Sequence, residues 1–160
     1  MTLSLLVLFA VVPVHAATPP PKVGANIDIT LFNDLNNRQQ VEPSIAVHPL
    51  KPDVLVAGAQ DLRLVAQGGH RWHGYYRSTD GGRTWSVSLL PGFPGDTSPE
   101  GTSSPLQNFN LTTDPVLAFD RSGNLYYTGV AVKVDPASNE ILDLALFVAK
   151  YVNDGQDYSG

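Results

Sequence analysis

The 160-residue chain contains no cysteine and little positive charge. Without cysteine, a disulfide framework, a thiolate metal site and a bacterial lipoprotein anchor are all excluded. Ten Lys and Arg against fifteen Asp and Glu give a net charge of −5. The cations form no block, which argues against a nucleic-acid partner because phosphate binding needs clustered Lys and Arg. No segment has the oxygen-rich spacing of an EF-hand, so we expect no cofactor and no metal.

The chain also lacks an apolar run of about 20 residues, the length needed to span a bilayer. Its longest apolar run, residues 3–14, precedes Val14-His15-Ala16 and then three prolines. This pattern predicts a signal peptide over 1–16, cleaved after Ala16, and a linker over 17–25, although the start carries no Lys or Arg. A buried first strand is the alternative. We expect a secreted or periplasmic protein with no membrane span.

Internal similarity indicates a repeated unit. Glu42–His48 resembles Asp114–Asp120, Val56–Gly58 resembles Tyr127–Gly129, and Tyr75–Asp80 resembles Ala149–Asp154, with offsets of 72, 71 and 74 residues. Short runs rich in β-branched and aromatic residues, bounded by turn residues, predict strands in both copies. They lie at 43–48, 53–60, 73–79 and 84–90, then at 115–120, 124–132 and 144–152. The second copy stops where its fourth strand is expected, and the class is all-β.

The connections differ in length in a regular way. In an antiparallel meander, alternate connections lie on opposite edges of the sheet. The connections within residues 49–52, 80–83 and 121–123 are tight, whereas 61–72, 91–113 and 133–143 are long. All long loops therefore share one edge, and that edge is where we expect function.

Ser78-Thr79-Asp80-Gly81-Gly82-Arg83-Thr84-Trp85 predicts a hairpin turn. Asp80 is expected to accept backbone N–H groups, as in Asx turns, and the two glycines permit positive φ. Ser78 and Thr84 face each other and are expected to share a hydrogen bond, while Trp85 packs between sheets. Five positions of this turn, Ser78, Asp80, Gly82, Thr84 and Trp85, are interpreted as structural.

This octapeptide matches the Asp-box pattern Ser-x-Asp-x-Gly-x-Thr-Trp, and the chain resembles the BNR-repeat propellers of the sialidase-like superfamily over about residues 37–160. The resemblance implies four-stranded β-propeller blades. It predicts blade 1 over 37–90 with the Asp box, a long loop over 91–113 and blade 2 over 114–160. Closed propellers need about four to eight blades. We therefore expect an incomplete ring of about two blades, the N-terminal part of a longer chain, with 26–36 as a strand that closes the ring.

Three carboxylates are candidates for catalysis. The resemblance implies an acid/base near Asp61, directly after the second strand, although loop capping is the alternative role. Glu42 and Asp114 open equivalent strands and would face a central channel, or else act as turn residues before proline. Sialidases carry an Arg-Ile-Pro motif where this chain has Val41-Glu42-Pro43, so sialidase catalysis is not supported.

Arg63, Arg71 and Trp72 are candidates for ligand binding, because an exposed Trp beside Arg stacks on sugar rings or on partner proteins. His70 and His73 flank this pair, but without a third ligand they do not define a metal site. The leading hypothesis is a secreted sialidase-like propeller for glycan recognition or hydrolysis, with enzyme activity left open. The alternative is a non-enzymatic propeller that binds proteins at the cell surface or in the periplasm.

Overall fold

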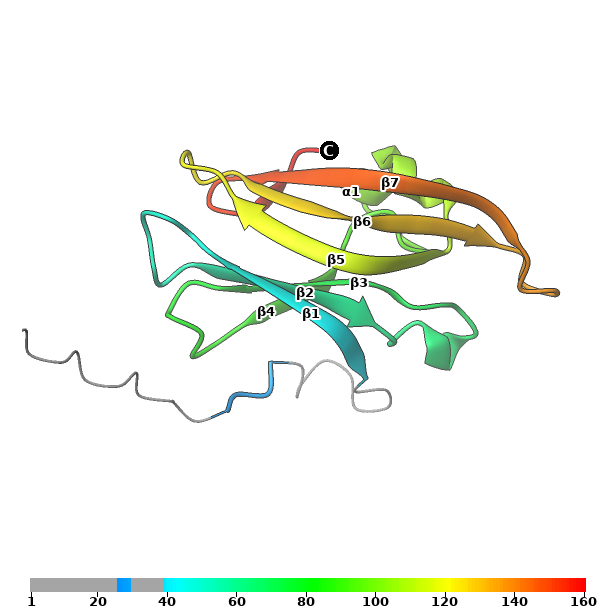
Figure 1. The fold of residues 1–160 in the computed structure, drawn as a ribbon, viewed down its shortest axis with the longest axis horizontal. Coiled ribbons are helices and arrows are strands. Elements are labelled where there is room, and N and C mark those ends of the chain that lie inside the picture. The colour runs from blue at the N-terminus through cyan, green and yellow to red at the C-terminus, as the bar shows by residue number, and fades with distance from the viewer. Residues whose placement is uncertain (1–25, 30–38) are drawn as a thin grey trace, which may run out of the picture.

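The structure, a computed structural model, describes residues 26–29 and 39–160. Two four-stranded antiparallel sheets account for most of this part (Figure 1). Sheet 1 consists of β1 (Gln40–Val47), β2 (Leu55–Asp61), β3 (Trp72–Ser78) and β4 (Ser86–Leu89). Sheet 2 consists of β5 (Leu111–Phe119), β6 (Leu125–Val134), β7 (Ile141–Val152) and β8 (Asp157–Tyr158). Each sheet follows chain order as a meander, which confirms the all-β prediction and the two repeated units.

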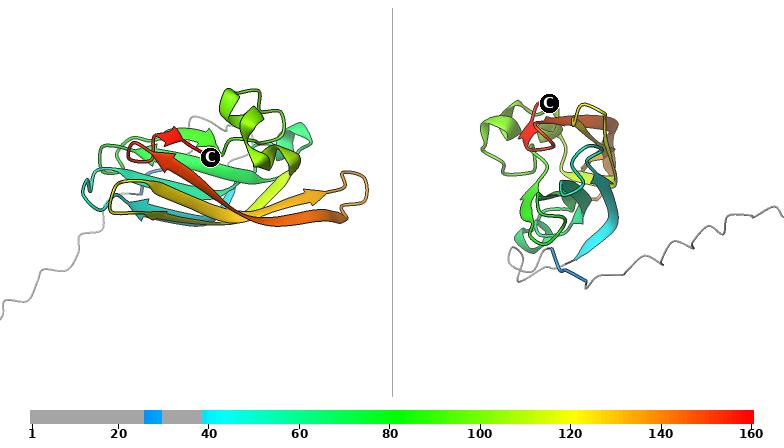
Figure 2. Two further views of the ribbon diagram at one scale, coloured as in Figure 1. Left: turned by 90° about the horizontal axis from the view of Figure 1, so that it is seen from above. Right: turned by 90° about the vertical axis from the view of Figure 1, so that its left-hand side faces the viewer.

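Short helices occupy two of the long connections. Between β2 and β3 lies η1 (Val65–Gln67), and between β4 and β5 lie α1 (Pro99–Ser103) and η2 (Pro105–Asn108). Ser98 caps α1 by accepting a hydrogen bond from the Gly101 N–H at 3.0 Å. Both views of Figure 2 place this connection close to the C-terminal strand β8. Within 26–29 and 39–160, no helix has the length and apolarity needed to cross a membrane.

The first strand of each sheet contains the same β-bulge. Glu42 has φ of 56° and Asp114 has φ of 59°, and a proline follows each of them. The strand register shifts at both places. A bulge leaves a residue outside the ladder, so proline is tolerated without the loss of a ladder hydrogen bond. The strands therefore begin at Gln40 and Leu111, before the prolines, and earlier than the sequence predicts.

The register also corrects the alignment of the two units. Ser44 pairs with Gly58 in sheet 1, whereas Val116 pairs with Thr128 in sheet 2. Measured from the shared bulge, the counterpart of Gly58 is thus Thr128 and not Gly129. The similarity of the two Gly-containing segments placed the second strands one residue out of register, and a shift of one residue exchanges the two faces of a strand.

The main core lies between the sheets, and its aromatic rings fit against glycines. Tyr127 donates a hydrogen bond from its hydroxyl to the Gly74 carbonyl at 3.1 Å, and a Cβ on Gly58 would lie 2.4 Å from that hydroxyl. Conversely, the His73 ring of sheet 1 packs over Gly129 of sheet 2, and a Cβ on Gly129 would lie 2.3 Å from this ring. Each sheet thus inserts one ring over a glycine of the other, which fixes their separation.

The turn between β3 and β4 is organised around Asp80. Its carboxylate accepts hydrogen bonds from the backbone N–H groups of Arg83 and Thr84, both at 2.9 Å, and from the hydroxyls of Thr84 and Ser78. Ser78 and Thr84 therefore meet through Asp80 and not directly, contrary to expectation. The Thr84 hydroxyl contributes most to holding the pKa of Asp80 at about 2. Trp85 packs on the outer face of sheet 1 and not between the two sheets as expected, and its indole N–H donates to the Gly82 carbonyl at 2.9 Å.

Two features of the second unit differ from the sequence prediction. A short fourth strand, β8, pairs with β7 through Tyr151–Tyr158 and Val152–Asp157. The connection between β6 and β7 is also shorter than predicted, because the Asp135 carboxylate closes a turn by accepting the N–H groups of Ala137 and Ser138.

The predicted signal peptide over 1–16 and linker over 17–25 lie outside the described residues. So does most of the predicted ring-closing strand over 26–36. Residues 26–29 form no strand, and Ile29 packs against the outer face of sheet 1.

Candidate functional site

Glu42 ties the two sheets together at their bulges. Its carboxylate accepts hydrogen bonds from the Asp114 backbone N–H at 3.3 Å, from the Thr113 hydroxyl at 3.4 Å and from the Gln60 side-chain amide. Asp114 is exposed, and within the described part of the chain no hydrogen bond reaches its carboxylate. The structure therefore brings these two residues together as an inter-sheet contact, and not as an acid pair across a cleft. Their role as turn residues before proline fits this geometry.

Arg71 joins the same network from the β2–β3 loop. Its guanidinium donates to the Gln60 side-chain oxygen at 3.3 Å, and Gln60 in turn donates to Glu42 and Thr113. Arg71 is otherwise exposed, so it remains accessible to a ligand at the edge where the long loops meet.

Asp61 lies inside the fold, at the end of β2, and is fully buried. It forms an ion pair with Arg63 at 2.5 Å and accepts a hydrogen bond from the Tyr76 hydroxyl at 2.7 Å. Burial alone would raise the pKa of Asp61, but the hydrogen bonds from Arg63 and Tyr76 outweigh it and lower the pKa. Burial, together with the Asp61 charge, raises the pKa of Tyr76. Asp61 is thus held ionised, which does not suit a proton donor.

The backbone of the following loop also depends on Asp61. The Arg63 N–H donates to the Asp61 carboxylate at 2.9 Å, the arrangement of an Asx turn. Loop capping and the positioning of the Arg63 guanidinium are therefore the two functions that the geometry gives to this carboxylate.

Trp72 does not form the expected ligand surface. It is the first residue of β3, its side chain is fully buried, and its indole N–H donates to the Leu90 carbonyl at 2.8 Å. His73 is also fully buried, between the rings of Tyr127 and Phe147 at centroid distances of 5.1 and 5.6 Å. Burial lowers the pKa of His73 to about 4. Of residues 70–73, only Arg71 and His70 are accessible to solvent.

No group of three or more His, Cys, Asp or Glu side chains suited to a metal ion occurs in residues 26–29 and 39–160. His70 and His73 do not come together as ligands, because one lies in a partly exposed loop and the other in the core.

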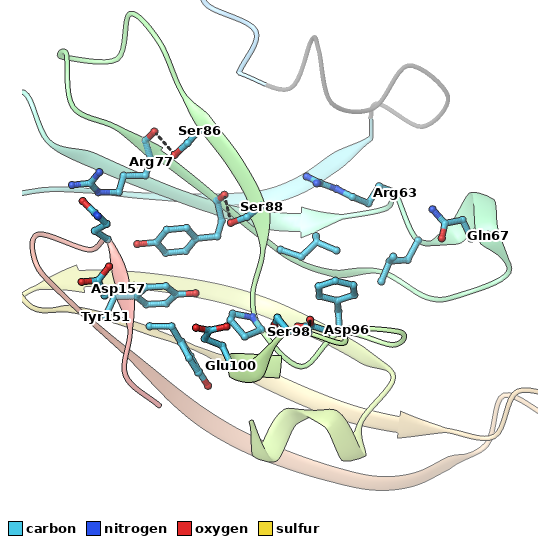
Figure 3. A pocket seen from close by; sticks show the side chains of 17 residues that line it. Arg63, Gln67, Arg77, Ser86, Ser88, Asp96, Ser98, Glu100, Tyr151 and Asp157 are labelled. Atoms are coloured by element: carbon cyan, nitrogen blue, oxygen red, sulfur yellow. Dashed lines mark hydrogen bonds between the residues drawn. The ribbon is translucent and has the colours of Figure 1, made fainter. Parts of the chain in front are cut away.

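A groove of about 950 Å³ lies where the outer strands of the two sheets diverge. We call it the rim groove. Arg63, Tyr75 and Arg77 line it from sheet 1 and the loop that follows β2, and Tyr151 and Tyr158 line it from sheet 2. The β4–β5 connection closes one end with Phe93, Asp96, Ser98 and Glu100. Figure 3 shows Arg63 and Arg77 on one wall, with Asp157 and Glu100 on the other.

Tyrosine rings form the floor of the rim groove. Tyr75 and Tyr151 stack with centroids 4.3 Å apart, and Tyr158 meets Tyr151 edge-on at 5.3 Å. Arg77 is anchored by its Nε, which donates to the Asp154 carbonyl at 3.1 Å. Its two terminal guanidinium nitrogens have no hydrogen-bond partner among the described residues. Several hydrogen-bonding groups therefore surround an aromatic floor, the composition typical of small-ligand sites.

Sequence reasoning placed the site near Glu42, Asp61, His70–His73 and Asp114, and of its candidates only Arg63 lines the rim groove. One sequence signal points to the groove. Tyr75 and Arg77 alternate along one strand and must share a face, and Tyr151 occupies the corresponding strand of the second unit.

No family model matches the chain, and no curated protein matches it. Several solved structures are similar to part of the chain, and two of them are described here. A Dyadobacter fermentans protein of unknown function is 14% identical, with a TM-score of 0.47, over 76% of this chain and 35% of that one. A leech intramolecular trans-sialidase, solved with 2,7-anhydro-Neu5Ac, is 20% identical, with a TM-score of 0.44, over 71% of this chain and 18% of that one. The chain therefore spans well under half the length of either structure.

Proposed function

We propose that the chain is part of a secreted, sialidase-like β-propeller that recognises glycans without hydrolysing them. The observation that carries this proposal is the rim groove. Stacked tyrosines give an apolar floor, and the charged groups on both walls match the hydroxyl and carboxylate groups of sugars. The Ser78–Trp85 turn and the repeated four-stranded meander support the propeller assignment.

The candidate carboxylates among the described residues give no support for hydrolysis. Most glycoside hydrolases use two carboxylates that flank the scissile bond, one of them protonated, whereas sialidases use a tyrosine nucleophile beside the acid. Asp61 is buried and ion-paired, and Glu42 is bound to the neighbouring sheet. Asp96, in the rim groove, accepts the N–H groups of Gly92 and Ser98, both at 2.9 Å, and these bonds lower its pKa despite partial burial. Asp61 and Asp96 are therefore held ionised, and Glu42 is engaged in the contact between the sheets.

A glycan array followed by calorimetric titration of the best ligand tests the proposal. Arg77→Gln and Glu100→Gln remove one charge from each wall of the groove. Each variant should weaken binding roughly tenfold, the value of one lost charged hydrogen bond. Lys133→Gln, an exposed change in β6 outside the groove, is the matched control and should bind as the wild type does.

A second assay uses a fluorogenic sialoside to test for hydrolysis. We expect binding without turnover. Turnover by the wild type that is lost in Asp61→Ala would refute the binding-only proposal in favour of hydrolysis. If no glycan binds, or if the groove variants bind as tightly as Lys133→Gln, the rim groove is not the site.

The alternative function, a module for protein binding, is favoured by a different observation. The outer face of sheet 2 exposes a row of apolar side chains that do not line the rim groove.

A further inference from the structure

The charged side chains that line the rim groove do not balance one another. They are two cations and three acids: Arg63, Arg77, Asp96, Glu100 and Asp157. Arg63 is already paired with the fully buried Asp61, so Arg77 is the one cation of the groove that no described carboxylate neutralises. None of the three acids forms an ion pair with a cation in residues 26–29 and 39–160. The groove therefore carries an excess of negative charge.

The negative excess lies at one end of the groove. Figure 3 shows Arg77 and Asp157 toward the same end, on opposite walls, so their charges offset each other. Glu100 and Asp96 lie toward the other end, on the β4–β5 connection. The cation on the wall opposite them is Arg63, whose charge is already offset by a buried carboxylate. A negative potential without a compensating cation therefore remains at the end that the β4–β5 connection closes.

The two acids at this end play different parts. The carboxylate of Asp96 is held by the backbone N–H groups of Gly92 and Ser98, both at 2.9 Å. Burial would raise the pKa of Asp96, but these hydrogen bonds outweigh it and lower the pKa. Glu100 is exposed, and no hydrogen bond from the described residues reaches its carboxylate. Glu100 is therefore free to bind a ligand, while Asp96 supplies a fixed negative charge at the same end.

Aromatic rings accompany these acids. Phe93 and Tyr158 line the rim groove together with Glu100. Glu100 and Tyr158 also line a smaller hollow between α1 and β8, which places both side chains at the boundary between the two hollows. The Tyr158 hydroxyl lies 3.3 Å from the hydroxyl of the buried Ser104, a contact that holds the ring against the β4–β5 connection. A carboxylate beside an aromatic ring binds an ammonium group through an ion pair and a cation–π contact.

Other sugar classes suit this end of the groove less well. The carboxylate of a sugar acid would meet Glu100 and Asp96 without a free cation to offset them, and like charges at close range cost free energy. A neutral sugar would offer only hydroxyl hydrogen bonds, which contribute less than hydrogen bonds between charged groups. A primary ammonium group carries the matching charge and donates three hydrogen bonds.

We propose that the rim groove recognises amino sugars with a free ammonium group, which binds between the Glu100 carboxylate and the Tyr158 ring. This ligand class rests on the proposed function, glycan binding in the same groove, and narrows it to one chemistry. At the far end, Arg77 donates from its unpaired guanidinium nitrogens to hydroxyl oxygens of the same saccharide. Arg77 therefore adds affinity, whereas Glu100 decides between an amine and a hydroxyl.

Oligosaccharides that differ in one functional group test the proposal. Glucosamine oligomers and glucose oligomers of the same linkage and length differ by an amine in place of one hydroxyl on each ring. Calorimetric titration of the whole chain should show roughly tenfold tighter binding of the glucosamine oligomer, the value of one charged hydrogen bond. Because salt screens exposed charges, this preference should shrink when the NaCl concentration is raised from about 0.1 M to about 1 M.

Three substitutions locate the source of the preference. Glu100→Gln removes the charge but keeps the shape of the side chain, so the preference for the amine should be lost. Glu140→Gln is the matched control, because Glu140 is an exposed acid in the β6–β7 turn, outside the groove, and its loss changes the net charge equally. It should keep the preference. Arg77→Gln should weaken the binding of both oligomers by a similar factor and also keep the preference, and circular dichroism checks that each variant is folded.

The outcomes separate the ligand class from glycan binding itself. Equal binding of the two oligomers, or tighter binding of a sialylated oligosaccharide, would overturn the amino-sugar proposal and leave glycan binding in place. An amine preference that survives in Glu100→Gln would also overturn it, since the amine would then bind elsewhere. If no oligosaccharide of any class binds, the proposed function is refuted together with its ligand class.

Discussion

Replacement of His73 by leucine should remove a defined part of the pH dependence of stability. The imidazole lies in the core between the rings of Tyr127 and Phe147. Burial lowers its pKa from 6.5 to about 4. The unfolded chain therefore binds a proton at a pH where the folded chain does not.

The size and sign of the effect follow from this difference. Because the folded pKa is the lower one, the contribution to stability is complete above about pH 6.5 and is lost as the pH falls to about 4. At about 1.4 kcal/mol for each pKa unit, the free energy of unfolding should fall by roughly 3 kcal/mol across this window. Leucine has a similar volume and does not titrate, so His73→Leu should lose this part of the decline.

Urea unfolding followed by tryptophan fluorescence provides the measurement, because Trp72 is buried in the same core. The urea midpoint of the wild type should fall steeply between about pH 6.5 and pH 4, and that of His73→Leu should fall less. The control is His70→Leu, which removes an imidazole from a partly exposed loop and should retain the wild-type decline. Equal slopes for the wild type and His73→Leu would refute the argument that His73 is buried in its neutral form.

Three further changes test the packing and the buried polar groups. Gly58→Ala places a methyl group against the Tyr127 hydroxyl and should lower the free energy of unfolding by about 1–3 kcal/mol, measured with urea. Tyr127→Phe leaves the buried Gly74 carbonyl without its donor and should cost about 1–2 kcal/mol in the same assay. Asp61→Asn leaves Arg63 without its ion pair and should cost roughly 3 kcal/mol, and a loss no larger than that of Lys133→Gln would contradict the ion-pair argument.

The sequence predicted the strands well because strand signals are local. Alternation, β-branched residues and turn residues identify seven of the eight strands within a few residues. The prolines after Glu42 and Asp114 misled the prediction of where strands begin, since a bulge that absorbs proline is not visible in composition. The similarity of Gly58 and Gly129 misled the alignment, since each accommodates a ring from the other sheet but at a different register position.

The candidate site was harder to predict because it combines distant segments. Arg63, Phe93 and Tyr158 come from three separate connections or strands, and only the divergence of the two sheets brings them to one groove. Trp72 looked accessible because its neighbours Arg71 and His73 are polar. In the structure β3 begins at Trp72, so the side chains of both Trp72 and His73 are buried in the core.

The fit of rings over glycines between the sheets has a consequence for how such sequences diverge. A Cβ at position 58 has room only if the ring at 127 is lost or moved, and the same holds for positions 129 and 73. Among related chains, each of these pairs should therefore change together, with small residues on one unit matched by rings on its neighbour. Pairs that vary independently in sequence would point to a different spacing between their sheets.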